Sequence, residues 1–235
     1  MPDTISKYKH LFFDLDHTLW DFEANSRATL SELFDELGLH GRGIPSFEVF
    51  HETYLPINSQ YWARYHHKLL SKDELRVGRF LETLRRFRID DEVLAETMAQ
   101  QYLDRSPYKT AIFPDALEVL DYLAKKYTLH IITNGFSEVQ DIKIRESRLE
   151  VYFRHVFVSE RVGHQKPERE IFLHAMEVTG GTPEDSLMIG DNMATDIMGA
   201  KAAGMDQVFF NPLGKKTRDK ATYEIAALSE LKNFL

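Results

Sequence analysis

Short apolar segments alternate with amphipathic stretches from Tyr108 to the C-terminus, and this alternation restricts the possible folds more than any other feature. The apolar segments, in which β-branched residues are frequent, are 129–132, 156–158, 187–189 and 207–210. Short buried strands alternating with helices are typical of a parallel sheet that is covered on both faces. We therefore predict an α/β fold, with a first strand at residues 8–13.

The stretches between these strands repeat apolar residues at helical spacing. A first helix is expected near Pro114, because proline is tolerated in the first turn of a helix. Three further helices are expected at 137–148, 168–178 and 194–203, the last ending before Gly204.

Residues 21–107 show almost no strand pattern and read instead as a run of helices. The helical segments are 24–37, 48–69, 72–88 and 92–103. The sheet domain is therefore predicted to be interrupted after its first strand. We expect a discontinuous core domain of residues 1–20 and 108–235, with a helical domain of residues 21–107 inserted in it.

Composition excludes several classes of protein. The chain has no cysteine, which removes disulfide frameworks, thiol nucleophiles and zinc ribbons. Its formal net charge of −8 argues against binding polymeric nucleic acid or an anionic membrane surface. An anionic substrate would therefore need a local device, such as a metal ion, one lysine or helix N-termini.

No segment approaches the roughly 20 apolar residues of a membrane-spanning helix. The short apolar run at residues 11–13 is followed at once by acidic residues and does not resemble a signal peptide. We expect a cytoplasmic protein, either a monomer or a homodimer.

Asp14 and Asp16 follow the first predicted strand. Residues i and i+2 at the end of a strand point the same way, so both carboxylates can face one place beyond the sheet. Ligands of open parallel sheets bind at that carboxyl edge. By itself an Asp-x-Asp pair is weak evidence for a functional site, because such pairs are frequently loop or helix-cap residues.

Three further strand-end features place polar groups at the same edge. They are Thr133 with Asn134, Asp191 with Asp196, and Lys166 before a predicted helix. Each has an ordinary alternative: a helix cap, an acid favoured by a helix dipole, or a solvated lysine. The requirements of core packing alone do not explain why all these polar groups occur, in this order, at one edge of the sheet.

This set of residues supports a specific chemistry. Several aspartates without histidine or cysteine suit a hard cation, best Mg²⁺. Mg²⁺ and one lysine can neutralise a phosphate, while hydroxyl and amide groups donate to its oxygens. One carboxylate can attack phosphorus, and its neighbour can act as acid and then base.

Four ordered sequence motifs resemble those of the haloacid dehalogenase-like (HAD) superfamily. They are DLDHTL at 14–19, TNG at 133–135, KP at 166–167 and GDNMATD at 190–196. The resemblance implies a Rossmann-like core with an inserted helical cap of the C1 type after the first motif. His17 stands where many members of the superfamily have glycine.

The resemblance also implies roles for these positions. Asp14 would be the nucleophile that forms an aspartyl-phosphate, and Asp16 the acid and base. Lys166 would steady Asp14 and the phosphate. Thr133 and Asn134 would bind the phosphate. The metal ligands would be Asp14, the backbone carbonyl of Asp16 and Asp191, with Asp196 supporting them.

A second aspartate at position 16 favours phosphoryl transfer over dehalogenation, because a leaving halide needs no proton. The segments SERVG at 159–163, NGF at 134–136 and LWDF at 19–22 resemble most the noncanonical pyrimidine 5′-nucleotidases. We therefore expect a phosphatase for small phosphorylated substrates, with nucleoside 5′-monophosphates preferred. Trp20 is a candidate for stacking on the base, although a packing role is about equally compatible with the sequence.

Several alternatives stay open. A sugar-phosphate or phosphoglycolate phosphatase and a phosphomutase share all four motifs. A non-catalytic ligand-binding homologue is disfavoured because every motif position is intact. A receiver-like signalling domain would carry adjacent acids after its first strand and no insertion of this size.

Overall fold

The computed structural model describes residues 7–235, which divide into two compact units. The sheet unit consists of the described residues up to Phe22 together with Thr110–Leu235, and the helical unit consists of Glu23–Lys109. The boundaries between the units therefore fall after Phe22 and after Lys109, whereas the sequence predicted them after residues 20 and 107. That they act as separate core and cap domains stays a prediction.

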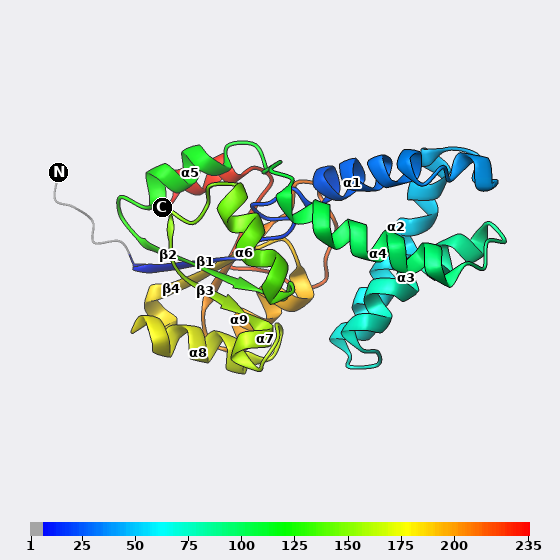
Figure 1. The fold of residues 1–235 in the computed structure, drawn as a ribbon. Helices are drawn as coiled ribbons and strands as arrows, with labels where there is room; N and C mark the ends of the chain where they lie inside the picture. The colour runs from blue at the N-terminus through cyan, green and yellow to red at the C-terminus, as the bar shows by residue number, and fades with distance from the viewer. Residues whose placement is uncertain (1–6) are drawn as a thin grey trace. The chain divides into compact units, whose positions relative to one another are not determined.

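Within residues 7–235, six parallel strands form one sheet in the order β3-β2-β1-β4-β5-β6 (Figure 1). The strands are β1 (His10–Phe13), β2 (Thr128–Thr133), β3 (Phe153–Val158), β4 (Ser186–Gly190), β5 (Asp206–Phe210) and β6 (Tyr223–Ile225). β6 was not predicted, because a three-residue edge strand with a central glutamate has no apolar run to reveal it.

Helices cover both faces of this sheet, which confirms the predicted α/β, Rossmann-like fold (Figure 1). The helices of the sheet unit are α5 (Ala116–Leu123), α6 (Ser137–Glu146), α7 (Ser159–Val162), α8 (Arg169–Thr179) and α9 (Met198–Ala202), with short turns η3 (Pro183–Asp185), η4 (Met193–Ile197) and η5 (Leu228–Asn233). Successive residues of β1 serve opposite faces: Leu11 and Phe13 pack with α5 and η5, whereas Phe12 packs with α8 and α9.

The predicted helix at 194–203 is interrupted in the structure. Its first part, η4, is a π-helical turn, and only its second part, α9, is α-helical. The Asn192 side chain accepts hydrogen bonds from the backbone of Ala194 and Thr195, while its carbonyl accepts from Asp196 and Ile197. These local bonds widen the first turn, which carries Asp196.

The helical unit has a hydrophobic core of its own. Its elements are α1 (Phe22–Glu36), η1 (His40–Arg42), α2 (Phe47–His66), α3 (Lys72–Arg86), α4 (Glu92–Arg105) and η2 (Ser106–Tyr108). Side-chain caps define three of the helix starts: Ser46 before α2, Ser71 before α3 and Asp91 before α4. Between residues 7 and 235, no helix combines the length and apolar character needed to cross a membrane.

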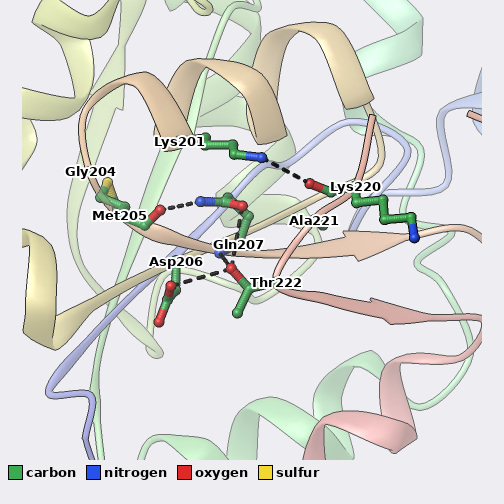
Figure 2. A pocket seen from close by; sticks show the side chains of 8 residues that line it. All are labelled: Lys201, Gly204, Met205, Asp206, Gln207, Lys220, Ala221 and Thr222. Carbon is green, nitrogen blue, oxygen red and sulfur yellow. Dashed lines mark hydrogen bonds between the residues drawn. The ribbon is translucent and has the colours of Figure 1, made fainter. Parts of the chain in front are cut away.

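A pocket of about 400 Å³ lies beside α9 and the beginning of β5 (Figure 2). Lys201 donates to the carbonyl of Lys220 at 3.4 Å, and the buried Gln207 amide bonds to the Met205 carbonyl. Because β5 begins here, the pocket lies at the amino edge of the parallel sheet. The strand-end carboxylates lie at the opposite edge, so this pocket is not part of the candidate active site.

Candidate active site

Asp14 and Asp191 follow two neighbouring strands, β1 and β4. Phe13 is in register with Ile189, and the Asp14 backbone nitrogen donates to the Ile189 carbonyl at 2.9 Å. From the centre of the sheet, strands β1, β2 and β3 follow one another towards one edge, and β4, β5 and β6 towards the other. The two aspartates therefore stand at the point where strand order reverses, where ligands of such sheets bind.

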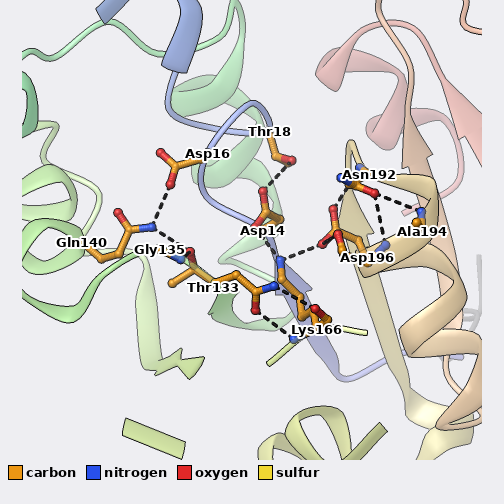
Figure 3. A network of polar contacts seen from close by, with 12 residues as sticks. Asp14, Asp16, Thr18, Thr133, Gly135, Gln140, Lys166, Asn192, Ala194 and Asp196 are labelled. Atoms are coloured by element: carbon orange, nitrogen blue, oxygen red, sulfur yellow. Dashed lines mark hydrogen bonds and ion pairs between the residues drawn. The ribbon is translucent and has the colours of Figure 1, made fainter. Parts of the chain in front are cut away.

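The Lys166 ammonium lies between two carboxylates (Figure 3). Its Nζ is 2.5 Å from Asp14 Oδ1 and 2.7 Å from Asp196 Oδ1, and its side chain is only 2% exposed. Burial alone would lower the pKa of Lys166, but the charges of Asp14 and Asp196 outweigh burial and raise it. Lys166 is therefore held as a cation.

Three carboxylates gather around this lysine: one oxygen each of Asp14, Asp191 and Asp196 lies within 4.8 Å of the others. A Cβ on Gly190 would collide with the Asp196 carboxylate, so only glycine permits this approach. Burial raises the pKa of Asp14 well above its ordinary value, with Asp196 and Asp191 adding to the effect and Lys166 opposing it. Burial and Asp196 raise the pKa of Asp191 to about 6.

The donor set of this cluster fits Mg²⁺. All its ligand atoms are carboxylate oxygens, which hard divalent cations prefer. One ammonium cannot balance three carboxylates, two of them buried and one half-buried. A bound cation would lower the pKa of Asp14 and Asp191, which burial and the neighbouring aspartates raise. Asp14, Asp191 and Asp196 are therefore the residues that would hold Mg²⁺.

The model of the haloacid dehalogenase-like hydrolases matches residues 8–204 of this sequence. The chain belongs to this family. The match begins before β1 and extends through η4, and so includes every carboxylate of the cluster.

Two relatives that are named pyrimidine 5′-nucleotidases align over nearly the whole chain. The pyrimidine 5′-nucleotidase PynA of Streptococcus pneumoniae is 33% identical, covering 95% of this chain and 93% of the relative. The pyrimidine 5′-nucleotidase YjjG of Escherichia coli is 28% identical, covering 97% and 98%. The family match and these relatives confirm the predicted enzyme class, a phosphoric monoester hydrolase.

A solved structure with a similar fold is that of the putative HAD-hydrolase YfnB of Bacillus subtilis, described as bound to magnesium. It matches with a TM-score of 0.87 and 30% identity, covering 97% of this chain and 98% of that one. The Rossmann-like fold predicted from the motifs is thus shared with a family member.

Within this family site, the Asp16 side chain turns away from the carboxylate cluster. Asp16 Oδ1 lies 2.6 Å from Lys143 Nζ, and Oδ2 accepts from Gln140 Nε2 at 2.8 Å (Figure 3). Burial would raise the pKa of Asp16, but Lys143 and Gln140 outweigh it and lower the pKa. The side chain therefore does not join Asp14, Asp191 and Asp196, which leaves the backbone carbonyl as its predicted contribution to a metal.

Thr133 and Asn134 have different surroundings. The Thr133 hydroxyl oxygen accepts from Gln140 Nε2 at 2.7 Å and from the Gly135 nitrogen at 3.1 Å, which leaves its hydrogen for an acceptor such as a phosphate oxygen. The Asn134 amide instead donates to the Lys166 carbonyl and accepts from the Lys166 nitrogen, both at 2.8 Å. Asn134 thus fixes the Lys166 backbone, and its predicted contact with phosphate stays a prediction.

The predicted stacking role of Trp20 does not agree with its position. Its side chain is fully buried in the core of the sheet unit. The Lys143 ammonium lies 4.2 Å from the centre of its ring, and the Phe22 ring packs edge-on against it. A residue packed in this way has no open face for a nucleobase, so Trp20 is corrected to a packing residue.

Gln140 and Lys143 are two site residues that the sequence did not reveal. Both lie on α6, directly after the segment that contains Thr133 and Asn134. Their three-residue spacing puts two polar side chains on one helix face, and both are buried there. A buried polar pair in an otherwise amphipathic helix is the available signal, but burial is not visible in a single sequence.

Mg²⁺ is expected to stabilise the protein, and more so at pH 7.5 than at pH 5. The pKa of Asp191 is raised to about 6 without metal, so the metal-free fold loses stability as pH rises through that value. When the carboxylates are ionised, Mg²⁺ at about 100 times its Kd should raise the free energy of unfolding by about 2.7 kcal/mol, which corresponds to roughly 5–10 °C in Tm. At pH 5 protons compete with the metal, and the gain should be at most half as large.

Thermal unfolding with and without Mg²⁺ at the two pH values measures this difference. Asp191→Asn should remove most of the Mg²⁺ effect. Equal gains at both pH values, or an unchanged gain in the variant, would contradict the assignment of the cluster.

Proposed function

We propose that this chain is a magnesium-dependent phosphatase that hydrolyses small phosphomonoesters through an aspartyl-phosphate on Asp14, with nucleoside 5′-monophosphates preferred. The observation that carries the proposal is the buried Asp14 carboxylate, paired with Lys166 at 2.5 Å inside a carboxylate cluster suited to Mg²⁺. A carboxylate beside an ammonium group and a site that would hold Mg²⁺ is suited to attack an anionic phosphate.

In the first step, an Asp14 oxygen forms a bond to phosphorus while the bond from phosphorus to the ester oxygen breaks. Asp16 gives its proton to the departing oxygen, which leaves as an alcohol. The anionic phosphate opposes the effect of Lys143 and favours the protonated form of Asp16 for this step.

In the second step, a water oxygen attacks phosphorus and passes a proton to Asp16. The bond between Asp14 and phosphorus then breaks, which releases phosphate and restores both aspartates. Asp16 thus serves as acid and then as base, and the chemistry ends with the enzyme unchanged.

Other side chains act on the charge of the phosphoryl group. Lys166 offsets negative charge beside Asp14, and the Thr133 hydroxyl donates to a phosphoryl oxygen. Asp14, Asp191 and Asp196, with the Asp16 carbonyl, would hold Mg²⁺, which would supply further positive charge to the phosphoryl group.

The nucleotide preference rests on relatives that are named pyrimidine 5′-nucleotidases and align over nearly the full chain. The helical domain predicted at residues 21–107 is proposed as the cap, because it is inserted just after the first motif, which contains Asp14 and Asp16. In this proposal, substrate choice within the family depends on the cap.

The proposal is tested by phosphate release from a panel of phosphomonoesters, with Mg²⁺ and again with a chelator. The panel sets pyrimidine and purine 5′-monophosphates against sugar phosphates, phosphoglycolate and glucose 1-phosphate. We expect Mg²⁺-dependent release that is fastest on pyrimidine 5′-monophosphates.

Release confined to sugar phosphates or phosphoglycolate would retain the mechanism and reject the nucleotide preference. Transfer of phosphate between positions of one sugar phosphate, without net release, would indicate a phosphomutase. Absence of turnover on every ester would point to a ligand-binding homologue.

A further inference from the structure

The Asp16 carboxylate is held at both of its oxygens by α6. Lys143 Nζ lies 2.6 Å from Oδ1, and Gln140 Nε2 donates to Oδ2 at 2.8 Å. These partners are 127 and 124 residues away from Asp16 in sequence, so the contact exists only in the folded sheet unit. Hydrogen bonds to a charged group are the stronger kind, and two of them restrict the rotation of one carboxylate.

The surroundings of Lys143 restrict where its ammonium can lie. The residue is 6% exposed, and its Nζ is 4.2 Å from the centre of the Trp20 ring and 5.6 Å from that of Phe22. Both rings belong to the segment that follows Asp16. Lys143 therefore contacts Asp16 by an ion pair, and the two aromatic side chains that follow Asp16 in the chain by cation–π contacts.

Gln140 connects Asp16 with Thr133. Its fully buried amide nitrogen donates to Asp16 Oδ2 and, at 2.7 Å, to Thr133 Oγ1. Its Oε1 is buried and has no hydrogen-bond partner among the described residues, an arrangement that costs about 1–3 kcal/mol. The amide is therefore oriented by its two acceptors. A Cβ on Gly135 would collide with this nitrogen, so glycine there leaves room for the contact.

We propose that Lys143 and Gln140 are positioning residues for Asp16, which hold its carboxylate in one orientation beside Thr133. An ionised carboxylate has about four lone-pair sites, so one donor on each oxygen leaves others for proton transfer. The inference rests on the proposed phosphatase function and adds to it two residues that touch neither the nucleophile Asp14 nor the carboxylates expected to hold Mg²⁺.

Lys143→Met tests the proposal, because methionine keeps an unbranched chain over the Trp20 ring and removes the charge. We expect kcat/KM for a nucleoside 5′-monophosphate, whose alcohol must be protonated as it leaves, to fall about 10- to 100-fold. For p-nitrophenyl phosphate, whose leaving group departs as an anion, we expect a fall below about 3-fold. A purely structural role would lower both values alike.

A double mutant shows whether Lys143 acts through Asp16. In an Asp16→Asn background, Lys143→Met should change kcat/KM for the nucleotide by less than about 2-fold. Lys126→Met is a matched control, since Lys126 also lies 4.2 Å from the centre of an aromatic ring, that of Tyr122, but precedes β2 at the amino edge of the sheet. Lys126→Met should leave kcat/KM unchanged for both substrates.

The outcomes separate this inference from the proposed function. The positioning role would be overturned, while phosphatase activity remains, by any of three results. They are equal losses of kcat/KM on both substrates, no loss on either, and a further full loss of kcat/KM in the Asp16→Asn background. If the wild-type protein hydrolyses neither ester, the function and the inference fall together. If Lys143→Met does not fold, Gln140→Leu must give the same dependence on the leaving group.

Discussion

Asp14→Asn is expected to lower phosphate release by at least about 10,000-fold. An amide cannot act as the attacking oxygen nucleophile, and removing the nucleophile of a covalent mechanism removes most of the catalysis. The measurement is the initial rate of Mg²⁺-dependent phosphate release at saturating substrate.

The loss should come from chemistry and not from unfolding. The asparagine amide would keep the shape of the side chain and reduce the repulsion from Asp191 and Asp196, while Lys166 would retain its contact with Asp196. We therefore expect Tm to change by no more than a few degrees. Asp35→Asn, an exposed position on α1, should keep full activity. Activity within 10-fold of wild type in Asp14→Asn would exclude Asp14 as the nucleophile.

Lys166→Met is expected to lower kcat by about 1,000-fold, the order found when a group that stabilises transition-state charge is removed. Lys166 contacts both the nucleophile Asp14 and the metal-site residue Asp196, so its removal leaves their repulsion uncompensated. Steady-state rates on the preferred ester measure the effect.

The same variant should also be less stable. Breaking a buried ion pair by removing one partner costs about 3–5 kcal/mol, or on the order of 10 °C in Tm for a chain of this length. Lys9→Met is the matched control, because Lys9 pairs with Asp185 at 3.0 Å with 73% of its side chain exposed. That surface pair should contribute less than about 1 kcal/mol. A Lys166→Met protein as stable and as active as the control would contradict both roles of Lys166.

The strands and the positions of the polar groups after them could be predicted from local patterns. Residues 129–132 and 187–189 lie within β2 and β4, and Asp14 and Asp191 follow their strands as expected. A strand in the middle of a parallel sheet is buried on both faces and typically forms a nearly continuous apolar run. β6 lies at the edge and has no such requirement, so no pattern marked it.

Long-range packing decided points that the sequence left open. Trp20 was equally compatible with stacking on a base and with packing, and it is buried because the chain after Asp16 packs into the core of the sheet unit beneath Lys143. The Asn134 amide was expected to face phosphate and binds the Lys166 backbone. In both cases the residue type is compatible with either role, and the deciding partner is distant in sequence.

The order of Asp14, Thr133, Lys166 and Asp191 along the chain already implies one shared edge, because parallel strands bring their carboxyl ends together whatever the loops between them. The direction in which each side chain points at that edge is a different kind of property. Asp16 turns to Lys143 and Gln140, and Asp196 turns to Lys166. These orientations depend on which donor lies within 3 Å of each carboxylate, and only the packing of α6, η4 and the strands against one another brings those donors into reach.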